Sequence, residues 1–154
     1  YANACHVAEV EVEIETGAVT LLAYHAVQDS GTLVNPLIVR GQAEGGIAHG
    51  IGNALFEWMG YDGAQPVTLS FGEYLLPTAP ELPPIRTYFK ESPSPLNPLG
   101  AKGAGEVGTI PAAAAVAAAV ENALEPFGVC IDAVPIAPAW LRALIARGAE
   151  SSTP

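Results

Sequence analysis

The feature that most constrains the fold is a regular alternation of apolar and acidic residues near the start of the chain. Between His6 and Glu15, a period of two with β-branched residues on one side is typical of a strand with one solvated face. Thr16-Gly17 then predicts a turn, and segment 19–27 predicts the returning strand. The sequence therefore predicts a β-hairpin with a solvated acidic face. The alternating residues are Ala8, Val10, Val12 and Ile14 on one side and Glu9, Glu11, Glu13 and Glu15 on the other.

A glycine-rich helix is predicted after the hairpin. Asn35-Pro36 is typical of a helix start, with Asn as N-cap and Pro in the first turn, and the helix would extend to about Met59. Each glycine inside a helix costs about 1 kcal/mol relative to alanine. The pairs Gly41/Gly45 and Gly46/Gly50 are spaced four apart and form bare strips on the helix surface. Such strips favour either close packing of a neighbouring backbone or close approach of a flat ligand, and the sequence leaves both open.

The rest of the chain predicts an α+β fold with helices packed on a mostly antiparallel sheet. The helix that Thr109 can cap is built almost wholly of Ala and Val before Glu121, so we expect it to be buried on most sides. We expect a single domain over residues 1–147 and a frayed tail over 148–154. The further predicted elements are strands at 67–71, 85–91 and 129–134, a proline-rich crossing at 77–84, and helices at 110–124 and 138–147.

Composition limits the class of partner. The formal net charge is −10, with six Lys and Arg residues in 154, so the chain lacks the basic surface that nucleic-acid binding needs. No apolar run approaches the roughly 18 residues of a membrane span. We expect no nucleic-acid partner, no membrane span and a cytoplasmic location. The chain opens on Tyr1 without an initiator Met, and its low charged fraction of 14% suggests that much of its surface is covered by something else.

The cysteine and histidine spacings predict no metal site made by the protein alone. Cys5 and Cys130 show no CxxC spacing, and we expect them to be small buried thiols. His6, His25 and His49 show no metal-ligand spacing with each other or with the cysteines.

A glycine-rich loop precedes the Ala/Val helix and contains the residues that could carry chemistry. Glycines at 100, 103, 105 and 108 can expose backbone N–H groups at a helix start, and Lys102 adds a positive charge, which suits anion capture. The loop matches neither the Walker pattern nor GxGxxG. Glu106 would be solvated on an ordinary loop. Placed against a buried helix and a cofactor pocket, it would be desolvated and suited to act as a general base.

Several segments in order form one recognisable series. They are Asn35-Pro36, the run Gly41-Gln42-Ala43-Glu44-Gly45-Gly46 with His49-Gly50, the segment from Tyr74 to Thr78, and the proline- and glycine-rich run from Ser92 to Glu106. This series resembles the closing stretch of molybdenum hydroxylase large subunits, a family that includes xanthine dehydrogenase, aldehyde oxidoreductase and aerobic carbon monoxide dehydrogenase. The similarity extends from about His6 to Leu144.

The resemblance implies the C-terminal molybdopterin-binding fold of that family and a mechanism. In the family, a glutamate in the Gly-Glu step of this loop takes a proton from a Mo–OH group, and the resulting oxo nucleophile attacks an electron-poor carbon while hydride passes to a Mo=S sulfur. Glu106 occupies that place and is implied to be the catalytic base. Gln42 is implied to reach the molybdenum centre and its dithiolene. The loop residues Lys102, Gly103, Ala104 and Gly105 are implied to lie against the pterin through their backbone.

The resemblance also implies partners. The molybdopterin-type cofactor would be shared with the remainder of the molybdenum subunit, and the iron–sulfur and FAD groups would lie on partner chains or domains. The chain alone would be inactive. The reaction would be hydroxylation of an aldehyde or N-heterocycle with water as oxygen source, or oxidation of CO, and the sequence does not select among them. His49 departs from the family, in which many relatives carry Gln at this position.

Two other functions stay open on sequence alone. One is a non-catalytic remnant or subunit-interaction module of the same fold, which the low surface charge would also suit. The other is a stand-alone binder of a phosphate ligand that uses the Lys102 loop.

Overall fold

The structure, a computed structural model, describes residues 1–151 and confirms an α+β fold. Its main sheet has the strand order β1-β2-β5, and three α-helices accompany it in the described part of the chain. The sheet strands are β1 (Asn3–Glu13), β2 (Ala18–Asp29) and β5 (Ile85–Phe89), and the helices are α1 (Pro36–Leu55), α2 (Ala112–Ala123) and α3 (Pro138–Ser151). The small elements are β3 (Tyr61–Asp62), β4 (Gln65–Pro66) and the 3-10 turns η1 (Ala79–Glu81) and η2 (Glu125–Phe127).

The predicted hairpin is confirmed. Strands β1 and β2 pair antiparallel from Asn3↔Asp29 to Glu13↔Ala18, with one irregularity between Glu9 and Val10. The strand glutamates are exposed, and the apolar residues between them are half-buried. Gly17 makes the turn at a φ of 76°, and its backbone packs directly on Pro138 of α3. The period-two alternation of apolar and acidic residues was therefore sufficient to predict this part of the fold.

The third strand joins the sheet in parallel. Strand β5 pairs with β2 in the register Tyr24↔Ile85 to Gln28↔Phe89, and it realises most of the strand predicted at 85–91. Two other predicted strands are wrong. Segment 67–71 is irregular because the Glu73 carboxylate accepts hydrogen bonds from the backbone N–H groups of Leu69 and Ser70. Segment 129–134 is also irregular, and there the N–H of Ile131 donates to the Glu121 carboxylate instead of to a strand.

Helix α1 begins as predicted and ends earlier. The Asn35 side chain accepts a hydrogen bond from the N–H of Ile38 at 3.2 Å, which confirms the N-cap. The predicted end at about Met59 is wrong, since the helix ends at Leu55. The carbonyl of Ala54 accepts a hydrogen bond from the N–H of Ile136 at 2.7 Å. That bond takes the place of the next helical bond and anchors the segment before α3 to the end of α1.

Helices α2 and α3 differ from the prediction in detail. Helix α2 begins at Ala112, and Thr109 does not cap it, because its hydroxyl donates to the carbonyl of Gly46 at 3.1 Å. We expected α2 to be buried on most sides, but Ala114 and Ala118 are exposed because α2 packs on one face only, against β1 and α1. Helix α3 continues through residues 148–151, part of the tail that we expected to be frayed, and residues 152–154 lie outside the described residues.

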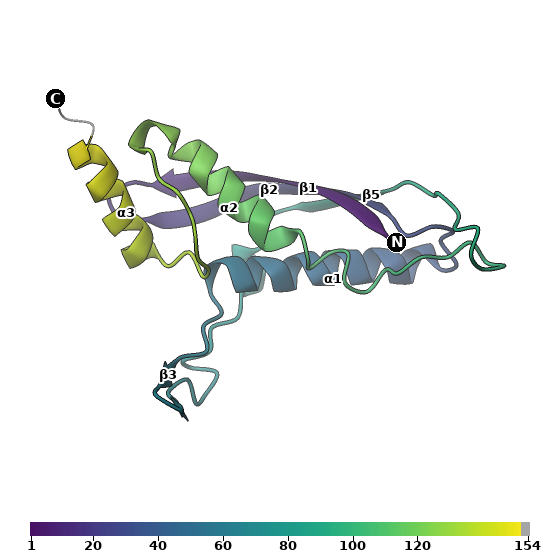
Figure 1. Ribbon diagram of the computed structural model, residues 1–154, viewed down its shortest axis with the longest axis horizontal. Helices are drawn as coiled ribbons and strands as arrows, with labels where there is room; N and C mark the ends of the chain where they lie inside the picture. The colour runs from purple at the N-terminus through teal and green to yellow at the C-terminus, as the bar shows by residue number, and fades with distance from the viewer. Residues whose placement is uncertain (152–154) are drawn as a thin grey trace.

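The hydrophobic core lies between the sheet and the two helices α1 and α2. Tyr24 and Ala26 on the inner face of β2 are fully buried. Figure 1 shows α1 running along the sheet with α2 beside it and α3 near the hairpin turn. The helical residues packed in this core include Ile47, Ile51 and Ala54 from α1, Val116 and Val120 from α2, and Leu141 and Ile145 from α3.

A long excursion separates α1 from β5. Residues 57–78, which we call the arm, contain the two-residue strands β3 and β4 and project away from the body of the molecule (Figure 1). No helix of the described residues is both long and apolar enough to cross a membrane. Cys5 and Cys130, expected to be buried, are both exposed, since Cys5 lies on the outward face of β1 and Cys130 lies in the irregular segment before α3.

The two glycine strips of α1 have different roles. A Cβ atom at Gly46 would lie 3.1 Å from the backbone of Gly108 and Thr109, and one at Gly50 would overlap the Cβ of Ala112. This strip lets the turn before α2 pack directly on α1. At Gly41 and Gly45, by contrast, an added Cβ would meet nothing within 4 Å. Close packing of a neighbouring backbone therefore explains the Gly46/Gly50 strip and does not explain the Gly41/Gly45 strip.

We predict opposite effects of alanine at the two strips. Gly50→Ala should lower the free energy of unfolding, because the roughly 1–3 kcal/mol cost of overpacking against Ala112 exceeds the gain of about 1 kcal/mol in helix propensity. Gly41→Ala, the matched control in the open strip, should raise it by up to about 1 kcal/mol. Urea unfolding of the apoprotein carrying each variant tests this. Equal effects of the two variants would contradict the assignment.

Candidate functional site

The proline- and glycine-rich loop of residues 92–108 is attached to the end of β2. Lys102 Nζ lies 2.6 Å from Asp29 Oδ2, and these side chains are 13% and 16% exposed respectively. The N–H of Lys102 donates to the carbonyl of Ser30 at 2.9 Å, and Gly31 pairs with Ala101 in a β-bridge. The cation at Lys102 is therefore already paired. This argues against a role for the Lys102 ammonium in the phosphate binding that the loop sequence left open.

Asp29 is the polar anchor of this attachment. Its Oδ1 accepts hydrogen bonds from the backbone N–H of Gly31 at 2.9 Å and of Ser92 at 3.2 Å. The hydrogen bond from Lys102 is the main reason that the pKa of Asp29 lies below its ordinary value, and the bond from Gly31 adds to it. One carboxylate therefore joins β2 to both ends of the proline-rich segment.

The interior of the loop is tied down by backbone contacts. The Asn97 side chain bonds Ala101 twice, donating to its carbonyl at 2.9 Å and accepting from its N–H at 3.1 Å. The carbonyl of Gly100 accepts from the N–H groups of Ser94 and Thr32. Gly100 has a φ of 67°, and a Cβ there would lie 2.8 Å from Pro93. Only glycine suits this position, which gives a physical reason for one glycine of the motif.

Gln42 lies in a polar cleft between α1 and the glycine loop. The cleft has a volume of about 270 Å³, and Gln42 and His49, two turns apart, share it. Both side chains are exposed. The floor is the open glycine strip of α1, and the opposite wall comes from the loop, with the lining residues Gly41, Gly45 and Gly46 on one side and Gly105 and Thr109 on the other.

Glu106 lies in a second cleft on the other side of the same loop. This cleft of about 400 Å³ is lined by the loop residues Gly103, Ala104, Gly105 and Glu106 and by residues at the start of β1, including Ala4. The carbonyl of Glu106 accepts from the N–H groups of Thr109 and Ile110 at 3.0 and 3.1 Å, which fixes its place at the start of the turn into α2. The Glu106 side chain is exposed. The desolvation expected for it is not provided by the described residues of this chain.

The two clefts meet at Gly105, which lines both. Of the predicted site residues, the structure places Gly103, Ala104, Gly105 and Glu106 together, puts Gln42 across Gly105 from them, and turns Lys102 toward the sheet. At Gly103 and Gly105, as at the open strip of α1, an added Cβ would meet nothing within 4 Å. Bare backbone on both sides of a polar cleft fits a flat, heteroatom-rich group such as a pterin.

Sequence analysis missed several polar residues at the end of β2. Asp29 was not singled out, although it anchors the loop. Gln28 is buried on the inner face of β2, and Ser30, the first residue after β2, is buried too. The Gln28 amide and the Ser30 hydroxyl find no hydrogen-bond partner within residues 1–151. The sequence pattern that could have revealed the buried Gln28 is the alternation of β2, which places Gln28 on the same face as Tyr24 and Ala26.

Comparison with known proteins decides the family. A family model described as the molybdopterin cofactor-binding domain matches residues 1–83, more than half of the chain. The chain belongs to the molybdenum hydroxylase family. The large subunit of nicotine 6-hydroxylase from Paenarthrobacter nicotinovorans is 42% identical over 139 residues, which are 90% of this chain and 17% of that subunit. The molybdenum-binding subunit of xanthine dehydrogenase from Escherichia coli O157:H7 is 38% identical over 89% of this chain and 18% of its own length.

The fold of this chain also occurs in a solved structure. Quinoline 2-oxidoreductase from Pseudomonas putida 86 superimposes with a TM-score of 0.91 and 46% sequence identity, over 94% of this chain and 19% of that chain. The present chain thus spans about a fifth or less of the relatives that it matches. Its residues 1–83 match the molybdopterin cofactor-binding domain of that family.

We predict a pH-dependent contribution of the Asp29–Lys102 pair to the stability of this chain. Because the folded-state pKa of Asp29 is lowered, its charge stabilises the fold at pH values above the ordinary aspartate pKa of about 4. That contribution is lost as the pH falls through the lowered folded-state pKa. Asp29→Asn should therefore lower Tm near neutral pH, and its Tm should approach that of the wild type in acid. Asp62→Asn, an exposed aspartate in β3, is the control, and a Tm deficit independent of pH would contradict the assignment.

Proposed function

We propose that this chain supplies the catalytic base and one wall of the cofactor site in a molybdenum-dependent hydroxylase. The observation that carries the proposal is the meeting of the Gln42 cleft and the Glu106 cleft at Gly105. One loop thereby presents a carboxylate on one side and bare backbone on the other. This arrangement suits a base that must lie beside, and not inside, a cofactor cradle.

The residues of this chain have separate roles in the proposal. When bound, the molybdenum cofactor supplies the redox chemistry that adds oxygen from water to a substrate carbon. Gln42 presents its side-chain amide to the cofactor, and Gly103, Ala104 and Gly105 lie against the pterin through their backbone. Lys102 acts through the loop, because its ammonium is held by Asp29 and its N–H by Ser30. The proposed contact between Lys102 and the cofactor is thus limited to the backbone atoms of Lys102 other than its N–H group.

Glu106 is proposed to accept the proton released when the attacking hydroxyl group becomes a nucleophile. Its side chain is exposed in this chain. A general base works best when its pKa lies near the operating pH, and an active site that excludes water strengthens the electrostatic interactions inside it. We infer that the remaining part of the subunit closes over the second cleft and supplies that exclusion. The relatives are more than five times as long as the matched segment, so enough polypeptide exists to do so.

An N-heterocyclic aromatic compound is the proposed substrate class. Two of the relatives described above are named for action on nicotine and on quinoline, and their identities to this chain, 42% and 46%, exceed the 38% of the xanthine dehydrogenase subunit. We infer that the electrons leave through iron–sulfur and FAD groups on partner chains or domains, as the family resemblance implies. The names of relatives as large or molybdenum-binding subunits support an assembly of several chains.

The alternative is a non-catalytic interaction module of the same fold. The many exposed apolar side chains favour an interaction role, which the enzyme portion also needs. Molybdenum content distinguishes the two, because only the enzyme portion should purify with stoichiometric molybdenum and a larger subunit.

We predict that Glu106→Gln in the complete enzyme leaves molybdenum content intact and lowers kcat by roughly 10²–10⁴-fold, the usual contribution of a general base. The amide is close in size to the carboxylate but cannot accept the proton. Steady-state kinetics with metal analysis measures both quantities. Glu125→Gln, an exposed glutamate beyond α2, is the matched control and should behave as wild type. Near-normal turnover of Glu106→Gln would remove Glu106 from this role.

For Gln42→Ala we expect a different profile. Loss of the amide from the cofactor cleft should lower the molybdenum content of the purified enzyme, while enzyme molecules that retain the metal keep most of their turnover. Asn53→Ala provides a control on the same helix, at an exposed position outside the cleft. Unchanged metal content together with unchanged kinetics would count against a cofactor contact at Gln42.

A further inference from the structure

The arm of residues 57–78 exposes many large apolar side chains. Phe71 is 83% exposed, Leu69 is 73% exposed and Met59 is 50% exposed. A cluster of large exposed apolar side chains on a projecting segment marks an interaction site. The further large apolar residues exposed on the arm are Trp58, Tyr61, Val67, Leu75 and Leu76.

Hydrogen bonds inside the arm hold these side chains outward. The Tyr74 hydroxyl donates to the Glu57 carboxylate, which links the two ends of the arm. Glu73 accepts from the N–H groups of Leu69 and Ser70 at 2.7 and 3.0 Å, and the buried Thr68 hydroxyl accepts from the N–H of Gly60 at 2.9 Å. The arm is therefore braced by hydrogen bonds between its own residues.

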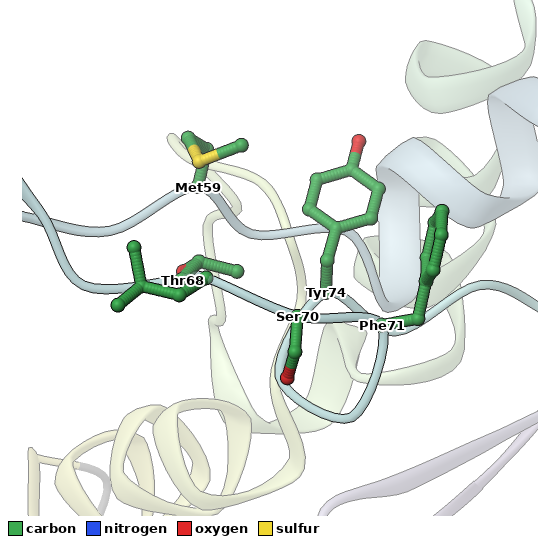
Figure 2. Close-up of a pocket in the computed structure, with 6 residues that line it drawn as sticks. Met59, Thr68, Ser70, Phe71 and Tyr74 are labelled. Atoms are coloured by element: carbon green, nitrogen blue, oxygen red, sulfur yellow. The ribbon is translucent and has the colours of Figure 1, made fainter.

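The arm also carries a pocket of its own. This pocket has a volume of about 320 Å³ and is lined chiefly by apolar atoms of Met59, Leu69, Phe71 and Tyr74. Figure 2 shows the rings of Phe71 and Tyr74 extending from the backbone in the same direction, with Met59 on the neighbouring segment. A preformed apolar pocket on a braced arm can receive a side chain of a docked surface.

Apolar surface continues from the arm to the body. At the base of the arm, a groove of about 700 Å³ lies between the end of α1 and the start of α3, with Trp58 and Leu75 on one side and Trp140 on the other. The arm pocket and this groove together offer one partner two places at which its side chains can anchor. Aromatic side chains are enriched at such anchoring points.

The charge around this surface has one sign. From residue 41 to residue 85 the chain contains no Lys or Arg, and the arm itself carries Glu57, Asp62 and Glu73. A surface that covers the arm must therefore be apolar at its centre and is favoured when Lys or Arg lies at its rim.

We propose that the arm docks onto the remaining part of the molybdenum hydroxylase large subunit, at an apolar surface with a basic rim. This inference rests on the proposal that the chain works as a portion of such a subunit. The same fold occurs in quinoline 2-oxidoreductase within a chain of which it makes up 19%, so about four fifths of that chain is further polypeptide that could cover the arm. A second copy of this chain is a weaker match, because its surface would bring the same acidic residues face to face.

Oxidation of Met59 tests the docking without reference to turnover. Met59 is the single methionine of this chain and lines the arm pocket. In the holoenzyme, hydrogen peroxide should convert Met59 to the sulfoxide about tenfold or more slowly than in urea-unfolded enzyme, as mass spectrometry of its peptide would show. Phe71→Asp or Leu69→Asp should restore fast oxidation. Gln65→Asp, which adds the same charge at an exposed polar position of the arm, should leave Met59 protected.

Three outcomes would overturn the proposal. The first is oxidation of Met59 in the wild-type holoenzyme at the unfolded rate. The second is protection that disappears on dilution of the enzyme, which would identify a second copy as the occupant. The third is full protection in both Phe71→Asp and Leu69→Asp. Failure of the proposed function would look different, because the protein would then purify without molybdenum or the rest of the subunit.

Discussion

The structure depends on the direct backbone contact between helix α1 and the turn that leads into α2. Gly46 faces Gly108 and Thr109, Gly108 faces the backbone of Ala43, and Gly50 faces Ala112. Only small groups, such as the Ala112 methyl and the Thr109 hydroxyl, lie at these points, so the turn follows the helix surface closely. This contact places the glycine loop along the open strip of α1 and thereby creates the cleft that contains Gln42.

A second attachment holds the loop to the end of β2. The Asp29–Lys102 pair and the backbone bonds of Ser30 and Gly31 hold the proline-rich segment to the end of β2. The loop is thus held at the sheet by charge and hydrogen bonds and at α1 by close packing. Between these two attachments, residues 103–106 line the second cleft, and an added Cβ at Gly103 or Gly105 would meet nothing within 4 Å. A segment that is fixed at its ends and open at its middle is well suited to face a ligand that other parts of the subunit help to hold.

Much of the fold could be predicted because it depends on local patterns. The hairpin followed from alternation, the start of α1 from Asn35-Pro36, and the family from several motifs in order. The predicted strands at 67–71 and 129–134 failed because apolar runs there resemble strands, whereas nearby carboxylates of Glu73 and Glu121 take their backbone N–H groups. The end of α1 was misplaced because the bond from Ile136 to Ala54 joins residues far apart in the sequence. The exposure of α2 and of Cys5 and Cys130 likewise depended on which faces have neighbours.

The sequence by itself determined the family, the chemical types present in the loop and the two glycine strips, because residue identity and short spacing encode these directly. Only the tertiary structure decided that one strip packs against Gly108 and Ala112 while the other lines a cleft. It also decided that Lys102 pairs with Asp29, 73 residues away in the chain, instead of facing a ligand. The physical reason is that packing and ion pairing depend on which distant segments meet, and a sequence pattern describes one segment at a time.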